Sequence, residues 1–382
     1  MYQVIIRNGT VIDPANNLHV QADVAIEDGR IAQVGSCSGD AVMTVDAEGC
    51  IVTPGLIDHH SHLYPIAKIG IPAEAMCFSS GVTTAVDAGS SGCDTFEKYL
   101  PFIENSKLTI KAYVNVCSTG LDSLPRETEN VNPASYDRDG LAKLFDRYGE
   151  YLLGLKLRTS KEIVKDLGYE PLRGTVALAE DLGQNVMIHS TNPPGEMNEL
   201  LGCLRRGDVL THMYMNKGST IMDESGKVSA AAYDARKRGV IFEAADARGH
   251  FSFEVSEPAI AQGFLPDIIA TDLTRLSMNL RPTAFSMANQ LSKYYMLGLD
   301  IDRLIECCTS APAHFMGLDG KAGCLTPGTW GDVAVFKMFE CGAIFGDRTY
   351  ADPSCILRKG TKRLRPMLTI KRGEAVYRDA FF

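Results

Sequence analysis

Apolar runs alternate with amphipathic segments through the middle of the chain. Eight runs have the length and composition of buried strands, and four of the segments between them show the apolar spacing of helices. The runs are IVTPGLIDHHSH (51–62), VTTAVDAG (82–89), IKAYVNVCS (110–118), YLLGLKLR (151–158), NVMIHS (185–190), DVLTHM (208–213), GVIFEAAD (239–246) and PDIIATD (266–272). The helices are expected at 94–107, 175–183, 196–207 and 229–239. Eight strands alternating with helices over roughly 250 residues predict an α/β fold, a (β/α)8 TIM-like barrel.

A doubly wound open sheet is the alternative arrangement for such a pattern. That fold usually carries a glycine-rich phosphate turn after its first strand. The first run is followed by YPIAKIGIPAE, which contains no such turn. The barrel is therefore favoured.

Both ends of the chain alternate apolar and polar positions and are broken by turn dipeptides. Asn8-Gly9 and Asp28-Gly29 are typical of hairpins, and Pro327-Gly328 marks a further turn. The expected strands lie within 2–9, 20–35, 41–49, 331–338 and 366–379. We predict a small β-sandwich domain built from residues 1–53 and 325–382, and a barrel domain at 54–324, because the ends of a domain often lie close together.

The composition is that of an ordinary globular protein, with 45% hydrophobic and 22% charged residues among 382. The net charge of −9 argues against nucleic acid and anionic membranes as partners. The sequence shows no signal-peptide pattern and no apolar run long enough to span a membrane. Eleven cysteines without a CxxC pair fit free thiols, so we expect a cytoplasmic protein. A closed homo-oligomer would be an ordinary state for it.

Histidines collect at the ends of the predicted strands. In Asp58-His59-His60-Ser61-His62, alternation places His60 and His62 on one face, where two imidazoles can bind one metal ion. His-x-His alone is a weak signal. Four further residues strengthen it, because the carboxyl ends of barrel strands meet at one mouth. These are Lys156 in the fourth run, His189 and His212 at the ends of the fifth and sixth, and Asp272 at the end of the eighth.

Lys156 lies among leucines, where a protonated ammonium would be unfavourable without a partner. One interpretation is an edge lysine whose ammonium reaches solvent. The other is that burial favours the neutral amine, which combines with carbon dioxide to give N6-carboxylysine. The resulting carbamate is an anion that could bridge two metal ions. We favour the carbamate, because the site otherwise lacks a second bridging anion.

The motif PGLIDHHSH resembles the first-strand motif of the amidohydrolase superfamily of metal-dependent hydrolases, and the likeness extends over nearly the whole chain. It implies two divalent metal ions, with zinc the expected metal. By this resemblance His60, His62 and Asp272 bind the more buried ion, His189 and His212 bind the second, and carboxylated Lys156 bridges both. The expected fold is the distorted barrel with a β-sandwich.

Within the superfamily the chain is most similar to the dihydroorotase-like amidohydrolase/deacetylase branch. The segments GLKLR, HSTNPP and DVLTHMYM carry this likeness. A true dihydroorotase has an Arg two residues after His-x-His, and Tyr64 stands there instead. Deaminases of the superfamily usually lack the bridging lysine and place a Glu near the fifth-strand histidine. Orotate chemistry and deamination are both disfavoured.

The resemblance implies a hydrolase that cleaves an ester or amide by a metal-bridging hydroxide, with Asp272 as the general acid and base. We expect the substrate to be a small molecule, an acylated hydroxy or amino acid that loses its acyl group, such as acetyl. A cyclic amide hydrolase of the dihydroorotase or hydantoinase kind and a non-catalytic scaffold remain the alternatives. Arginine is suited to a substrate carboxylate. Candidate substrate contacts are Arg158, Arg275, Arg248, His250, Tyr64 and Asn192, and Asp58 is expected to orient a ligand histidine.

Overall fold

The computed structural model describes residues 1–121 and 129–382, and its centre is an eight-stranded parallel sheet in the order β13-β12-β11-β10-β9-β8-β7-β6. An isolated bridge between Ser61 and Leu273 joins the first and last strands, so the sheet closes into a barrel. Its strands are β6 (Leu56–Ser61), β7 (Val82–Ala88), β8 (Thr109–Asn115), β9 (Leu152–Arg158), β10 (Asn185–His189), β11 (Val209–Thr211), β12 (Ile241–Ala245) and β13 (Ile268–Ala270). Each of the eight apolar runs holds one of these strands, which confirms the predicted barrel.

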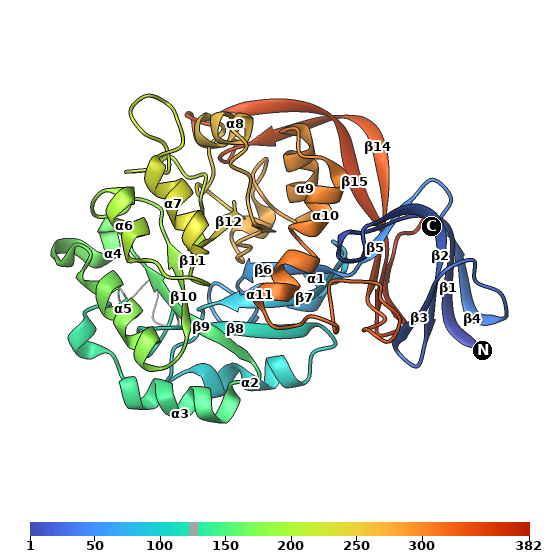
Figure 1. The fold of residues 1–382 in the computed structure, drawn as a ribbon, viewed down its shortest axis with the longest axis horizontal. Coiled ribbons are helices and arrows are strands. Elements are labelled where there is room, and N and C mark those ends of the chain that lie inside the picture. The colour runs from blue at the N-terminus through green and yellow to red at the C-terminus, as the bar shows by residue number, and fades with distance from the viewer. Residues whose placement is uncertain (122–128) are drawn as a thin grey trace.

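Helices cover the outside of the barrel (Figure 1). They are α1 (Ala73–Phe78), α2 (Phe96–Glu104), α3 (Arg138–Tyr148), α4 (Lys161–Val164), α5 (Glu170–Asp181), α6 (Met197–Cys203), α7 (Ala230–Arg238), α8 (Phe253–Ala261), α9 (Met287–Met296), α10 (Ile301–Glu306) and α11 (Ser310–Phe315). The four predicted helices correspond to α2, α5, α6 and α7. Ser229 caps α7 by accepting a hydrogen bond from the backbone of Ala232, which is why that helix begins where the polar residue precedes the alanine run.

A second sheet combines the two ends of the chain, which lie at the same side of the molecule (Figure 1). Its strands are β1 (Tyr2–Asp13), β2 (Leu18–Glu27), β3 (Arg30–Gly35), β4 (Ala41–Asp46), β5 (Ile51–Pro54), β14 (Val333–Gly346), β15 (Leu357–Lys371) and β16 (Glu374–Arg378). The sheet is mixed and has its own apolar core, which includes Val4, Ile26, Val52, Val335 and Ile370. The small β domain from both termini is confirmed. Its boundaries at 53/54 and 324/325 stay a prediction.

Two turn dipeptides have different outcomes in this sheet. Asp28-Gly29 forms the predicted hairpin turn between β2 and β3, and both residues have positive φ, 49° and 69°. The prediction of a strand break at Asn8-Gly9 is wrong, because β1 continues to Asp13 and the dipeptide forms a bulge in its pairing with β2. A bulge needs the same left-handed backbone as a tight turn, so the sequence signal is shared.

The β14–β15 hairpin extends from the terminal sheet across the barrel to α8 (Figure 1). The backbone N–H of Leu364 in β15 donates to Ser292 of α9. Arg358, near the start of β15, forms two hydrogen bonds to the carboxylate of Glu257 in α8. The C-terminal sheet strands therefore hold two of the barrel's outer helices. In the described part of the chain, no helix is long and apolar enough to cross a membrane.

Candidate metal centre

The six predicted metal-binding residues converge at the carboxyl ends of the barrel strands. All six are buried, with exposed fractions of 6% or less. His60 lies near the end of β6 and His62 one residue beyond it, Lys156 lies in β9, and His189 is the last residue of β10. His212 follows β11 directly, and Asp272 stands two residues after β13. The six residues thus share one mouth, as predicted. Their roles as metal ligands stay a prediction.

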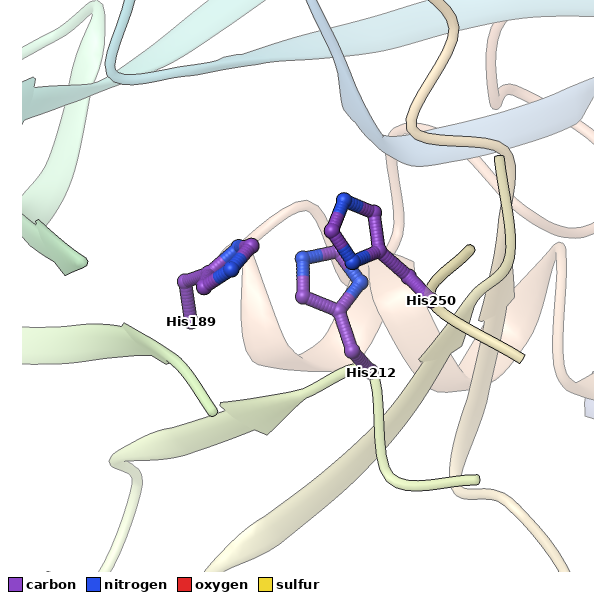
Figure 2. Close-up of side chains that lie close together, drawn as sticks. All are labelled: His189, His212 and His250. Atoms are coloured by element: carbon purple, nitrogen blue, oxygen red, sulfur yellow. The ribbon is translucent and has the colours of Figure 1, made fainter. Parts of the chain in front are cut away.

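Two groups of side chains at this mouth have the spacing of metal ligands. His60, His62 and Asp272 form one group, with ligand atoms all within 4.8 Å of one another. His189, His212 and His250 form the other at the same limit. Figure 2 shows the three rings of the second group gathered together, and the rings of His212 and His250 stack with centroids 4.3 Å apart. His250, which was expected as a substrate contact, lies beside the predicted second metal site, and its role stays a prediction.

Lys156 stands next to the first group, with Nζ 3.5 Å from Nε2 of His60. Burial lowers the pKa of Lys156 to about 8, which favours the neutral amine needed to form a carbamate. The backbone of Gly89 lies against this side chain, where an added Cβ would approach the Cβ and Cγ of Lys156 to 2.6 Å. A residue larger than glycine would displace the lysine stem.

Hydrogen bonds orient the rings of the first group. Nδ1 of His62 lies 2.8 Å from Oγ of Ser90, and that hydroxyl donates to Asp87 at 2.8 Å. Oε1 of Glu243 lies 2.8 Å from Nδ1 of His60, and its other oxygen lies 2.5 Å from Nδ1 of His59. With Nδ1 occupied, the Nε2 lone pairs of His60 and His62 face Asp272, whose Oδ1 is 3.6 and 3.5 Å away.

Within residues 1–121 and 129–382, Nε2 of His212 and Oδ2 of Asp272 at this mouth are buried and have no hydrogen-bond partner. His212 points Nδ1 at the carbonyl of Ala245, 2.6 Å away, which leaves Nε2 with a lone pair. Both residues also adopt left-handed backbones, with φ of 65° for His212 and 52° for Asp272. Buried polar groups are normally paired, and strained backbones cluster at functional sites. The donor set of imidazole nitrogen, carboxylate oxygen and a lysine amine therefore fits divalent metal ions.

Burial keeps four of the imidazoles at the mouth neutral. Burial lowers the pKa of His60 to about 4 and that of His250 to about 3, and it lowers the pKa values of His189 and His212 well below the usual range. Burial alone would raise the pKa of Asp272. The neighbouring His62 and the charge of Arg248 outweigh it and hold that pKa well below its ordinary value. Neutral imidazoles beside an ionised carboxylate are the protonation states that metal binding requires.

The predicted substrate contacts separate into two sets. Arg158 and Arg248 line the small cavity at the mouth, together with Lys156, His189 and Asp272. The guanidinium of Arg275 donates to the carbonyls of Gly70 and Pro65. Tyr64 is fully buried and stacks on Tyr99, and the amide of Asn192 donates to Glu162. The last three residues are not among those that line the cavity, because local backbone and ring contacts hold their side chains elsewhere.

Two sequence-based expectations need correction. Strict alternation would place His59 on the face opposite His60, yet both rings contact Glu243. The pairing of β6 with β7 shifts register between Asp58 and Ser61, so simple alternation fails there. Asp58 was expected to orient a ligand ring. Its carboxylate instead accepts hydrogen bonds from the backbone and hydroxyl of Thr271, the residue before Asp272.

Sequence reasoning missed Glu243, Ser90 and Glu129. Glu243 is a single carboxylate inside the apolar strand β12 and is fully buried, the same signal that singled out Lys156. Ser90 belongs to the turn after β7. Glu129 is buried and accepts a hydrogen bond from Nε of Arg158 at 2.6 Å. A search for lone buried charges could have found Glu243, whereas Glu129 lies in an irregular segment without a pattern.

Comparisons with known proteins agree with this architecture. Residues 51–376 match the model of the amidohydrolase family. A deacetylase of Agrobacterium fabrum, Atu3266, is 33% identical over 82% of this chain and 77% of its own. A deacetylase of Enterococcus faecalis is 27% identical over 98% of both chains.

Among solved structures, a dihydroorotase aligns with a TM-score of 0.88 at 30% identity, over 98% of this chain and 99% of that one. An adenine deaminase aligns with a TM-score of 0.89 at 25% identity, over 99% and 100%. From the match over most of its length, this chain belongs to the amidohydrolase family.

Proposed function

We propose that the protein is a binuclear metallohydrolase that removes the acyl group from an acylated hydroxy or amino acid. The observation that carries the proposal is the pair of unpartnered buried atoms, Nε2 of His212 and Oδ2 of Asp272, at the mouth that also holds Lys156. Three curated relatives named deacetylases support the deacylation reaction.

In this proposal His60, His62 and Asp272 hold one divalent cation, and His189 and His212 hold the second. Lys156, as its carbamate, would supply an anionic ligand shared by the two, and His250 would complete the second group. Divalent cations bound in this way supply a water molecule of lowered pKa and polarise the substrate carbonyl. Zinc is the metal we propose, since imidazole and carboxylate ligands suit it.

In this proposal Asp272 is the general acid and base that transfers the protons. Its Oδ1 lies beside the ligand histidines, while Oδ2 has no hydrogen-bond partner. Oδ2 can therefore accept a proton from the attacking water and return it to the leaving nitrogen or oxygen. Arg248 stands 3.7 Å from this oxygen, and its charge helps to keep Asp272 ionised before the reaction.

A panel of substrates tests this function. It contains N-acetyl amino acids, O-acetyl hydroxy acids and cyclic amides such as dihydroorotate and hydantoin, assayed with zinc-loaded and manganese-loaded protein. We expect hydrolysis of acylated acids and a loss of about 100- to 10,000-fold in kcat for Asp272→Asn. Asp319→Asn is the control, because this aspartate is exposed and pairs with His314. Hydrolysis of cyclic amides alone would favour the cyclic amide alternative, and inactivity of the metal-loaded protein on every substrate would contradict the proposal.

A further inference from the structure

Arg248 is a charged side chain at the candidate metal centre. The proposed reaction uses its charge beside Asp272 but not its hydrogen-bond donors. It lies in the loop between β12 and α8 and has a left-handed backbone with φ of 62°. Its backbone N–H donates to the hydroxyl of Thr283 at 3.2 Å, which fixes the loop. The side chain lines the cavity that also contains Asp272 and Lys156. An arginine in a strained conformation at this place calls for a functional reason.

The hydrogen-bonding groups of Arg248 are not satisfied within the described chain. Its Nε is buried and has no partner. One terminal nitrogen lies 3.7 Å from Oδ2 of Asp272, which is too long for a hydrogen bond. A buried donor without a partner is unfavourable unless a ligand supplies the acceptor. The guanidinium can thus bind an anion that enters the cavity.

A second guanidinium lines the same cavity. Arg158, the last residue of β9, donates through Nε to the fully buried carboxylate of Glu129, and Asn115 donates to the other oxygen of that carboxylate. The hydrogen bond to Glu129 engages Nε of Arg158 and neither of its terminal nitrogens. Glu129 therefore orients Arg158 from behind, while the planar fork remains suited to a carboxylate.

We propose that Arg248, together with Arg158, binds the free carboxylate of the substrate and makes that carboxylate the main determinant of specificity. The inference rests on the proposed deacylation. Since Arg248 is 3.7 Å from the atom that moves the proton, the carboxylate must lie close to the scissile bond. The substrate class is therefore an α-acylamino or α-acyloxy acid, with the carboxylate on the carbon that bears the acylated nitrogen or oxygen.

The test compares one pair of substrates in three proteins. The pair is the acylated acid that the wild type hydrolyses fastest and the same compound with its carboxylate converted to a primary amide. The proteins are the wild type, Arg248→Gln and Arg138→Gln, the last being an exposed arginine that pairs with Asp181 on the outer surface. Metal content and thermal midpoint are measured for each, so that a loss of folding or metal is separated from a loss of recognition.

We expect the wild type and Arg138→Gln to prefer the acid by about 10- to 100-fold in kcat/KM. Arg248→Gln should lose that preference through a higher KM for the acid, while its KM for the amide stays near the wild-type value. Arg248→Lys should recover part of the preference, because an ammonium keeps the charge without the fork. Equal losses on both substrates in Arg248→Gln, or no preference in the wild type, would overturn the inference and leave deacylation standing. Inactivity of the metal-loaded wild type on both would instead overturn the proposed function itself.

Discussion

The carboxylate of Glu243 holds His60 in place, with 2.8 Å between Oε1 and Nδ1 of the ring. The interaction fixes the tautomer of His60, because Nδ1 must carry the proton for the hydrogen bond to form. Nε2 is then the lone-pair atom, and it faces Lys156 and Asp272. Glu243 comes from β12 and His60 from β6, so the contact also ties two strands across the interior of the barrel.

Replacing Glu243 by glutamine should weaken metal binding. The amide keeps the size of the side chain but loses the charge that supports two imidazoles, and partners of this kind typically contribute 10- to 100-fold in metal affinity. We expect a drop of about that size in zinc affinity, measured by competition with a chromophoric chelator. Glu199→Gln, an exposed glutamate paired with Arg173, is the control. Unchanged affinity in Glu243→Gln would show that the carboxylate has no part in metal binding.

The carbamate on Lys156 should be observable directly. Protein prepared with ¹³C-bicarbonate is expected to show a carbamate carbon signal in its ¹³C NMR spectrum, and Lys156→Ala should lack it. Short carboxylates such as propionate should restore part of the activity of Lys156→Ala, because they can supply a bridging anion in the space left by the side chain. Absence of the signal in active, metal-loaded wild type would refute the modification.

The ion pair between Lys293 and Asp246 should be sensitive to removal of one partner. Nζ of Lys293 donates to Oδ2 of Asp246 at 2.6 Å, and both side chains are buried at the base of the loop that carries Arg248. Lys293→Met leaves a buried carboxylate without its cationic partner and, among the described residues, with only the hydroxyl of Tyr294 as a side-chain donor. Losses of roughly 3–5 kcal/mol are typical when one partner of a buried ion pair is removed. We expect a clear fall in thermal midpoint, measured by calorimetry, and recovery of most of it in Lys293→Met/Asp246→Leu. Equal midpoints for the single and double variants would contradict this explanation.

Two cysteines should differ in their reactivity towards iodoacetamide. Cys341 is exposed, whereas burial and the charges of Asp94 and Asp137 raise the pKa of Cys93 to about 11. Since the thiolate is the reactive form, little of Cys93 reacts at pH 8, and its rate should rise about tenfold per pH unit towards that pKa. Peptide mass spectrometry after timed labelling at pH 8 and pH 9 gives both rates. A pH-independent rate for Cys93 would be inconsistent with the raised pKa.

The sequence predicted the barrel because each strand lies in an apolar run that alternates with helical segments, and five of the eight runs carry a candidate ligand. His189 and Asp272 could be placed at one mouth from topology alone, without any knowledge of distances. The positions of Tyr64 and Arg275 could not be predicted, since each depends on contacts made by loops after the strands. Alternation failed at His59, where a register shift in β6 turns the ring towards Glu243.

Metal content per chain tests the central claim most directly. Elemental analysis would be carried out on protein prepared with bicarbonate, on Lys156→Ala, and on Lys321→Ala as an exposed-lysine control. The proposed binuclear centre predicts about two metal ions per chain in the wild type and the control, and one or none in Lys156→Ala. Fewer than one ion in all three proteins, despite added zinc and manganese, would contradict the binuclear centre.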